Sequence, residues 1–129
     1  MAIRIGVVGL GYRGRDWVRE VKAAAPIFEL VACVDPDAAG LQRVSAELRI
    51  PPAQCFTRLD DVLHAGTCDA VIIATPADFH FTTCEAALTH KLAVLIEKPF
   101  TFQVSEAARL VSLAESNNIP LLVGQNYRY

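Results

Sequence analysis

The sequence lacks a strong charge of either sign and lacks any long apolar run. Its formal net charge is −2, so it has no excess of basic residues of the kind that binds nucleic acid or an anionic membrane surface. None of its apolar runs approaches the roughly 20 residues that cross a bilayer. We therefore expect neither a nucleic acid nor a membrane as a partner.

The chain also lacks a C-x-x-C pair. Its four cysteines, Cys33, Cys55, Cys68 and Cys84, are widely spaced and do not form the paired spacing of a zinc site. Cys33 and Cys84 fall inside apolar patterns, so we expect buried, reduced thiols rather than a disulfide framework or a zinc site. The first apolar run begins at Ile3, which leaves no room for a signal peptide, and we expect a cytoplasmic protein.

What the sequence does contain is typical of one compact domain. Hydrophobic residues make up 53% of its 129 residues and charged residues 20%, a composition that excludes disorder. A chain of this length buries about two-thirds of the surface that its unfolded form exposes. It is therefore long enough for a substantial core.

Six apolar runs alternate with segments of helical periodicity. The runs are apolar nearly throughout, as in parallel strands that are covered on both faces. The intervening segments repeat apolar residues at a spacing near 3.6; the last helix, for example, has Val104, Val111 and Ala114 on its expected inner stripe. The predicted strands are Ile3–Val8, Leu30–Val34, Cys55–Phe56, Ala70–Ala74, Ala93–Ile96 and Leu121–Val123. The pattern predicts an α/β fold with a doubly wound, six-stranded parallel sheet in the order 3-2-1-4-5-6 and right-handed crossovers.

The first predicted strand runs directly into a G-x-G-x-x-G motif formed by Gly9, Gly11 and Gly14. An amphipathic helix follows, and Asp35 ends the next apolar run about 20 residues later, which is the context of a dinucleotide-binding site. Gly9 would make the tight turn, Gly11 would let the backbone approach a pyrophosphate, and Gly14 would let the helix pack closely. The helix N-terminus offers free N–H groups to the pyrophosphate. The alternative is a glycine-rich turn in an unrelated α/β domain.

Asp35 also favours NAD over NADP. A carboxylate there accepts hydrogen bonds from the adenosine ribose hydroxyls. A 2′-phosphate would instead meet the negative charges of Asp35 and Asp37, with no Arg, Lys or Ser beside them in the sequence. Arg13 leaves NADP open, because its side chain could turn toward a 2′-phosphate. In the first helical turn a cation opposes the helix dipole, and a bound pyrophosphate would reverse that effect.

Two further motifs follow the fourth and fifth predicted strands. They are the loop from Thr75 through Pro76 to His80, T-P-x-x-x-H, and the turn Glu97-Lys98-Pro99. With the glycine turn and the terminal segment 124–128, they resemble the cofactor domain of the glucose–fructose oxidoreductase, inositol dehydrogenase and MocA family of NAD(P)-dependent oxidoreductases. The resemblance covers the whole chain.

The resemblance implies a role for each motif. Lys98 corresponds to the family's active-site lysine, whose ammonium would hydrogen-bond a substrate hydroxyl and stabilise the alkoxide as hydride leaves. Glu97 would bond the cofactor or orient Lys98, unless it is an ordinary exposed acid at the end of a strand. Thr75 and Pro76 would line the pyrophosphate and the nicotinamide ribose. The other implied contacts are Tyr12, Arg13, His80 and Asn126 with the cofactor, and Arg128 with the substrate.

The resemblance also implies a domain organisation and a function. We expect residues 1–124 to form an NAD(P)-binding domain and residues 125–129 to begin a linker to an absent C-terminal substrate domain. The function implied is hydride transfer between nicotinamide and a sugar, polyol or related compound, with this chain alone binding cofactor but doing almost no chemistry. The alternatives are an NAD-using glycosidase or epimerase with transient oxidation, and a non-catalytic NAD(H) sensor. Homo-oligomers are also open, since the family usually assembles through the second domain.

Overall fold

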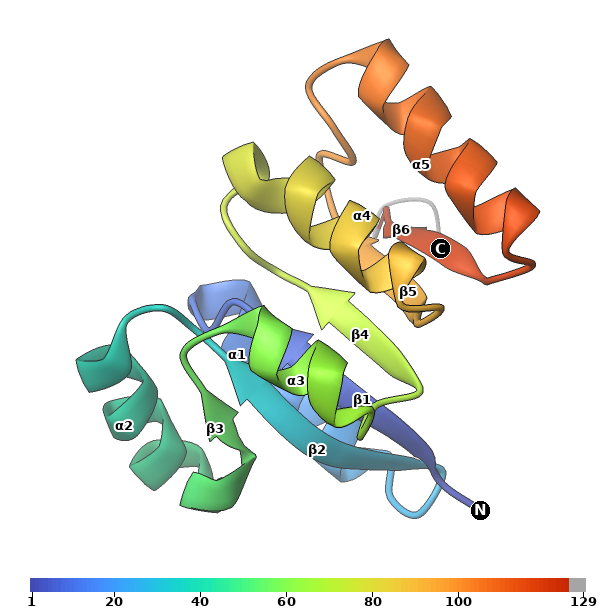
Figure 1. Ribbon diagram of the computed structural model, residues 1–129. Coiled ribbons are helices and arrows are strands. Elements are labelled where there is room, and N and C mark those ends of the chain that lie inside the picture. The colour runs from blue at the N-terminus through green and yellow to red at the C-terminus, as the bar shows by residue number, and fades with distance from the viewer. Residues whose placement is uncertain (126–129) are drawn as a thin grey trace.

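The computed structural model describes residues 1–125, in which six parallel strands form one sheet in the order β3-β2-β1-β4-β5-β6 (Figure 1). The predicted fold class and strand order are confirmed. The strands are β1 (Ile3–Val8), β2 (Phe28–Val34), β3 (Cys55–Phe56), β4 (Ala70–Ile73), β5 (Ala93–Glu97) and β6 (Leu121–Gly124). The helices are α1 (Tyr12–Ala23), α2 (Ala38–Leu48), α3 (Leu59–Ala65), α4 (His80–Thr89) and α5 (Val104–Ser116), with short 3-10 turns at Pro52–Gln54 and Ala77–Phe79.

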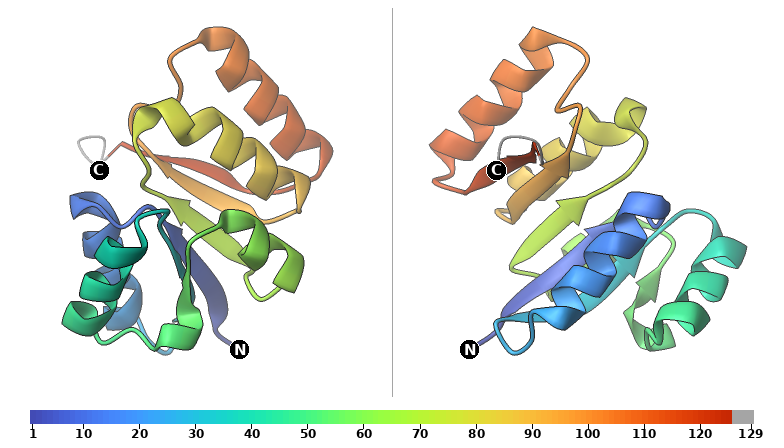
Figure 2. Two further views of the ribbon diagram at one scale, coloured as in Figure 1. Left: turned by 60° about the vertical axis from the view of Figure 1, so that its left-hand side comes forward. Right: turned by 180° about the vertical axis from the view of Figure 1, so that it is seen from behind.

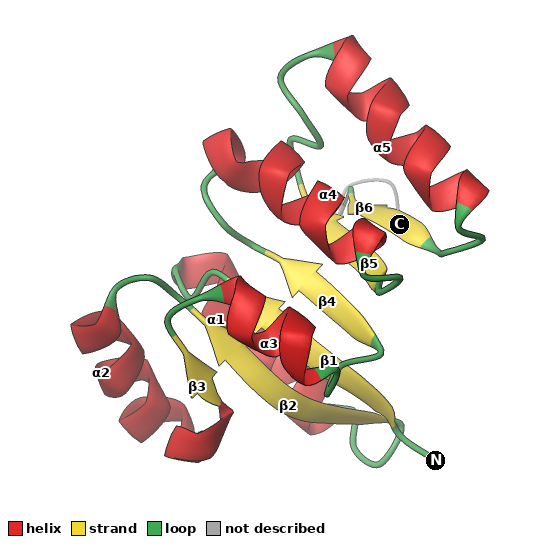
Figure 3. Ribbon diagram, in the orientation of Figure 1, coloured by secondary structure: helices red, strands yellow, loops and turns green. Residues whose placement is uncertain are grey.

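The two faces of the sheet have separate apolar cores. In Figure 1, α3 and α4 lie in front of the sheet and α1 lies behind it; the rear view in Figure 2 brings α1 forward. The core beneath α1 and α2 consists of Ile5, Val7, Leu10, Val18, Val21, Cys33, Leu41, Val44, Ile50 and Ile72. The opposite core joins α3, α4 and α5 to the sheet through residues that include Val62, Leu88, Val94, Ile96 and Leu110. Colouring by secondary structure shows how helices and strands alternate along the chain (Figure 3).

The orientation of α5 differs from the prediction. Val104 and Val111, expected on the inner stripe, are 87% and 42% exposed, whereas Leu110 and Ala114 are buried. Burying the long side chain of Leu110 turns the helix so that the two valines face outward. Ala114 alone of the three named stripe residues lies where it was expected.

Three of the four cysteines, Cys33, Cys68 and Cys84, are buried as predicted, whereas Cys55 is half-buried. All four are free, and Cys33 and Cys84 are fully buried. Burial raises the pKa of each of these two thiols to about 12. Within residues 1–125 there is no group of three or more potential metal ligands, and no helix combines the length and hydrophobicity that a membrane span requires.

Arg4 and Asp69 connect the first strand to the start of β4. The Asp69 carboxylate accepts hydrogen bonds from the Arg4 backbone N–H at 2.9 Å, from Nε at 3.1 Å and from Nη2 at 2.7 Å. The Asp69 N–H in turn donates to the Arg4 carbonyl at 2.8 Å. The hydrogen bonds from Arg4, the side-chain bond above all, lower the pKa of Asp69 to about 2.

This pair predicts a specific acid dependence of stability. Because the pKa of Asp69 is lower in the folded protein, the ionised carboxylate stabilises the fold above its unfolded-state pKa of about 4, and this contribution is lost as the pH falls toward 2. We expect Asp69→Asn to be less stable than the unmodified protein at neutral pH but to lose less stability between about pH 4 and pH 2. Urea unfolding at a series of pH values measures both. Arg4→Met should likewise reduce the change in the free energy of unfolding over this pH range. If neither variant alters that pH dependence, Asp69 is not the group responsible.

Candidate cofactor site

The predicted site residues converge at the edge of the sheet where its strands end. Parallel pairing places the ends of β1, β2, β4 and β5 at one edge, so the turns that follow them are neighbours. These turns carry the glycine motif, Asp35, Thr75 and the Glu97-Lys98-Pro99 segment. Ligands of doubly wound sheets bind beyond this edge.

The glycine turn has the close contacts that the motif predicts. Gly9 has a φ of +89°, and a Cβ there would lie 2.7 Å from backbone atoms of Ala74 and Thr75. A Cβ on Gly14 would overlap the carbonyl oxygen of Gly9, so only glycine lets α1 pack this closely. A Cβ on Gly11 would meet no atom within 4 Å. The space in front of Gly11 is therefore open to a ligand.

The N-terminus of α1 faces this open space. Gly11 is the N-cap and provides no side-chain hydrogen bond, and the first turn contains no acidic residue. The N–H groups of the first turn have no acceptor within the helix, and they carry the positive end of its dipole. Tyr12, the first helical residue, is largely exposed. The turn therefore suits an anion such as a diphosphate.

Asp35 connects the ends of β1 and β2. Its Oδ2 accepts the Leu10 N–H at 2.8 Å and its Oδ1 accepts the Asp37 N–H at 2.9 Å. A carboxylate oxygen can accept more than one hydrogen bond, so both oxygens keep capacity for hydroxyl donors. The side chain is thus fixed by backbone donors before any ligand is bound.

The cations near this edge differ from the prediction. Arg43 on α2 brings its Nη2 to 4.0 Å from the Asp37 carboxylate, so a cation lies near the acids in space although none lies beside them in the sequence. The Arg43 side chain extends toward Asp37, which is the N-cap of the same helix. This proximity is not evident from the linear sequence. Arg13 pairs with Glu97, on the β5 side of the sheet, and so points away from Asp35. The turn toward a 2′-phosphate that would leave NADP open is therefore not the arrangement seen.

Glu97 is buried, with only 7% of its surface exposed, so it is not an exposed strand-end acid. Its Oε1 accepts Nη2 of Arg13 at 2.9 Å and Nε1 of Trp17 at 2.7 Å. The hydrogen bond to Glu97 is the main cause that raises the pKa of Arg13. None of the sequence motifs pointed to Trp17. The signal that could have identified its role is the indole N–H, which needs an acceptor when the ring is buried.

His80 holds two loops together. The ring is 1% exposed, with Nδ1 2.7 Å from the Pro99 carbonyl and Nε2 3.0 Å from the Thr75 carbonyl. The predicted contact between His80 and the cofactor does not follow from this geometry, because protein surrounds the whole ring. His80 instead fixes the Thr75 loop relative to the turn that contains Lys98.

The remaining predicted residues lie at the same edge or outside the described region. Lys98 is exposed, and within residues 1–125 its ammonium makes no hydrogen bond or ion pair. The Thr75 Oγ1 is buried and has no hydrogen-bond partner in that part of the chain, while Pro76 is exposed. Asn126 and Arg128 lie outside the described residues.

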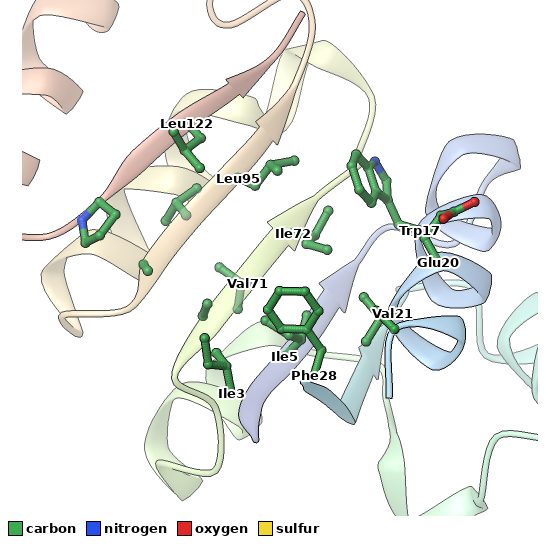
Figure 4. A pocket seen from close by; sticks show the side chains of 15 residues that line it. Ile3, Ile5, Trp17, Glu20, Val21, Phe28, Val71, Ile72, Leu95 and Leu122 are labelled. Atoms are coloured by element: carbon green, nitrogen blue, oxygen red, sulfur yellow. The ribbon is translucent and has the colours of Figure 1, made fainter. Parts of the chain in front are cut away.

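An apolar hollow lies elsewhere, on the sheet face beside α1 (Figure 4). Its volume is about 420 Å³, and Ile72, Leu95 and Leu122 from β4, β5 and β6 form part of its floor. Trp17 reaches it from α1. The hollow is on the face of the sheet rather than at the strand ends, and it contains none of the predicted cofactor residues.

Comparison with known proteins identifies the family of the chain. A family described as an oxidoreductase family with an NAD-binding Rossmann fold matches residues 3–125. Inositol 2-dehydrogenase of Corynebacterium glutamicum is 35% identical over 119 residues, which are 92% of this chain and 35% of that protein. UDP-N-acetylglucosamine 3-dehydrogenase of Acidithiobacillus ferrooxidans is 35% identical over 122 residues, 95% of this chain and 36% of that protein.

Solved structures of similar enzymes contain the same fold. The structure of the Acidithiobacillus ferrooxidans enzyme superposes with a TM-score of 0.84, over 96% of this chain and 38% of that one. Lactobacillus casei scyllo-inositol dehydrogenase with bound NAD(H) and scyllo-inositol has 26% identity and a TM-score of 0.86, over 96% and 36%. The chain thus spans about a third of the length of these relatives. It belongs to the Gfo/Idh/MocA family of oxidoreductases and corresponds to its NAD-binding Rossmann fold.

Proposed function

We propose that this chain is the cofactor domain of an NAD-dependent dehydrogenase that acts on a secondary hydroxyl of a polyol or sugar. The observation that carries the proposal is the convergence, at one sheet edge, of an anion-binding helix N-terminus, a fixed carboxylate and an exposed lysine. The relatives named above act on inositol and on a nucleotide sugar, and both compounds carry ring hydroxyls.

In this proposal the adenosine half of NAD binds at the first two strand ends. The diphosphate lies against Gly11 and the first N–H groups of α1, where a side chain would exclude it. The ribose hydroxyls donate to Asp35, which Leu10 and Asp37 already hold in place. The buried Thr75 Oγ1, which lacks a partner among the described residues, lies beside the same turn and fits a neighbouring polar ligand atom.

Lys98 provides the charge for the chemical step. When bound, NAD would supply the acceptor for the hydride that leaves the carbon carrying the substrate hydroxyl. The proton of that hydroxyl would pass to a base in the part of the substrate pocket that this chain does not supply. The Lys98 ammonium donates a hydrogen bond to that hydroxyl oxygen and stabilises the negative charge that develops on it. The two residues on either side of Lys98 are held by bonds to other elements, Glu97 to α1 and Pro99 to His80.

We also propose that residues 1–124 form the cofactor domain and that the rest of the substrate pocket comes from polypeptide beyond them. The relatives are about three times as long as this chain. Without a closed pocket, Lys98 lacks the orientation and water exclusion that hydride transfer needs. The chain alone should therefore bind NAD and turn over little substrate. Neither transient oxidation nor a sensor role gains support from the named relatives, which are dehydrogenases.

The carboxylate at the end of β2 predicts the choice of cofactor. We expect NAD(H) to bind more tightly than NADP(H), and Asp35→Asn to lose most of that preference while the amide keeps one acceptor oxygen. Loss of a charged hydrogen bond costs about 1.5–3 kcal/mol. Calorimetric titration measures the Kd for NAD(H) and the Kd for NADP(H), whose ratio gives the preference. Asp37→Ala is the control for the neighbouring acid. Tighter binding of NADP(H) to the unmodified chain would show that the assignment is wrong.

Two glycines of the motif should respond differently to substitution. Gly11→Val fills the open space in front of α1, so we expect NAD binding to weaken by about tenfold or more with little loss of stability. Gly14→Ala meets the Gly9 carbonyl, so we expect a loss of about 1–3 kcal/mol of stability. Cofactor titration and urea unfolding of both variants separate the effects. Full NAD affinity in Gly11→Val would place the diphosphate elsewhere.

The proposed role of Lys98 is tested in the chain joined to a substrate domain. We expect Lys98→Met to lower kcat by about 10²–10⁴-fold and to leave the Kd for NAD nearly unchanged, because the ammonium acts on the substrate oxygen. Steady-state kinetics with inositols and UDP-N-acetylglucosamine as trial substrates measures turnover. Lys91→Met, which follows α4 at the opposite edge of the sheet, is the matched control. Equal turnover in the two variants would remove Lys98 from the mechanism.

A further inference from the structure

The bonds to Glu97 join parts of the site that are far apart in the sequence. Glu97 is the last residue of β5 and directly precedes Lys98. A single oxygen of its carboxylate accepts both Arg13 and Trp17, at 2.9 and 2.7 Å. Both donors lie on α1, whose N-terminus faces the glycine turn. The lysine turn is thereby tied to the helix that would hold the diphosphate.

No other charged contact of α1 makes this connection among the described residues. Arg15 and Arg19 pair with Glu47 on α2, at 3.8 and 3.1 Å, and Lys22 donates to the Leu48 carbonyl at 2.6 Å. Those bonds fix α1 to its neighbouring helix, on the adenosine side of the sheet. The bonds to Glu97 fix it to the side that contains Lys98.

Arg13 is held less firmly than the carboxylate that it contacts. Its side chain is 47% exposed. Nη1 makes a second ion pair, to Oδ2 of Asp16 at 3.4 Å, and Cζ lies 5.7 Å from the centroid of the Trp17 ring. The pair joins a buried carboxylate to a half-exposed guanidinium, and such an ion pair is weak support for stability. A role in positioning the turn that contains Lys98 explains these bonds better than a contribution to the stability of the fold does.

We propose that Arg13, Trp17 and Glu97 are positioning residues that couple occupancy of the glycine turn to the placement of Lys98. This rests on the proposed function, in which the diphosphate binds at the first turn of α1. A diphosphate there orders the turn that contains Arg13, and the bonds from α1 then hold Glu97 and the adjoining Lys98 peptide in one position. Linkage requires the reverse effect as well, so a fixed lysine turn favours the bound diphosphate.

The test uses ADP, which fills the proposed diphosphate and ribose contacts but has no nicotinamide to cover Lys98. The rate at which an amine-acylating reagent modifies each lysine is followed by mass spectrometry with and without saturating ADP. We expect ADP to slow acylation of Lys98 by about fivefold or more, within the range of ordinary coupling free energies. Lys22 and Lys91, both distant from this turn, should be unaffected.

Two variants break the connection in different ways. Trp17→Phe removes the indole donor and keeps a ring in the hollow, and Glu97→Gln keeps an acceptor oxygen and removes the charge that pairs with Arg13. In both we expect ADP still to bind but its effect on Lys98 to fall to nearly none. Arg19→Met, which removes an ion pair of α1 to α2, is the matched control and should keep the full effect.

The outcomes separate the two proposals. If ADP and NAD do not bind the unmodified chain, the proposed function fails. If ADP binds but Lys98 reacts at the same rate, or if both variants respond like the unmodified protein, the coupling is overturned while the function stands. Fluorescence of Trp17, the sole tryptophan, gives a second measurement that needs no variant. An ADP-dependent change in its emission is expected, and unchanged emission with bound ADP counts against the coupling.

Discussion

The close approach of α1 to the turn after β1 is the constraint on which the rest of the site depends. It is possible because Gly14 has no side chain to meet the Gly9 carbonyl and because Gly9 adopts a positive φ. This contact directs the N-terminus of α1 toward the ends of the strands. Asp35 completes the corner by bonding the backbone of Leu10, so the turn is also fixed to β2.

The lysine turn is held from both faces of the sheet. From the α1 side, Arg13 and Trp17 bind Glu97, the residue before Lys98. From the opposite side, His80 at the start of α4 binds the carbonyl of Pro99, the residue after it. A doubly wound sheet has helices on each face, and here both layers position one exposed side chain at the edge between them. Among residues 1–125 the Lys98 ammonium has no partner, while the backbone on either side of it is fixed.

How much could be predicted from the sequence depended on the range of the interactions. The strands, Gly9 to Gly14 and Asp35 were predictable because each is encoded by local periodicity or by a spacing within about 30 residues. The strand order followed from the doubly wound fold that the alternation of strands and helices indicates. The Glu97 bonds to α1 were not, since they join positions 84 and 80 residues apart, and no local pattern reports which donors a buried carboxylate meets. The rotation of α5 was missed for a related reason: helical periodicity allowed two inner stripes, and packing of Leu110 against the sheet selects one.

The charges on α1 show how the fold keeps the start of this helix suited to an anion. The first turn contains Arg13 and no acid, an arrangement that opposes the helix dipole by a few tenths to about 1 kcal/mol. An acid in that turn would stabilise the helix but would also repel a diphosphate. The structure instead supplies the compensating carboxylates from other elements, Glu97 of β5 for Arg13 and Glu47 of α2 for Arg15. Carboxylates outside the first turn thus neutralise the two arginines. The N–H groups of that turn have no acid beside them, so the helix N-terminus keeps its positive potential.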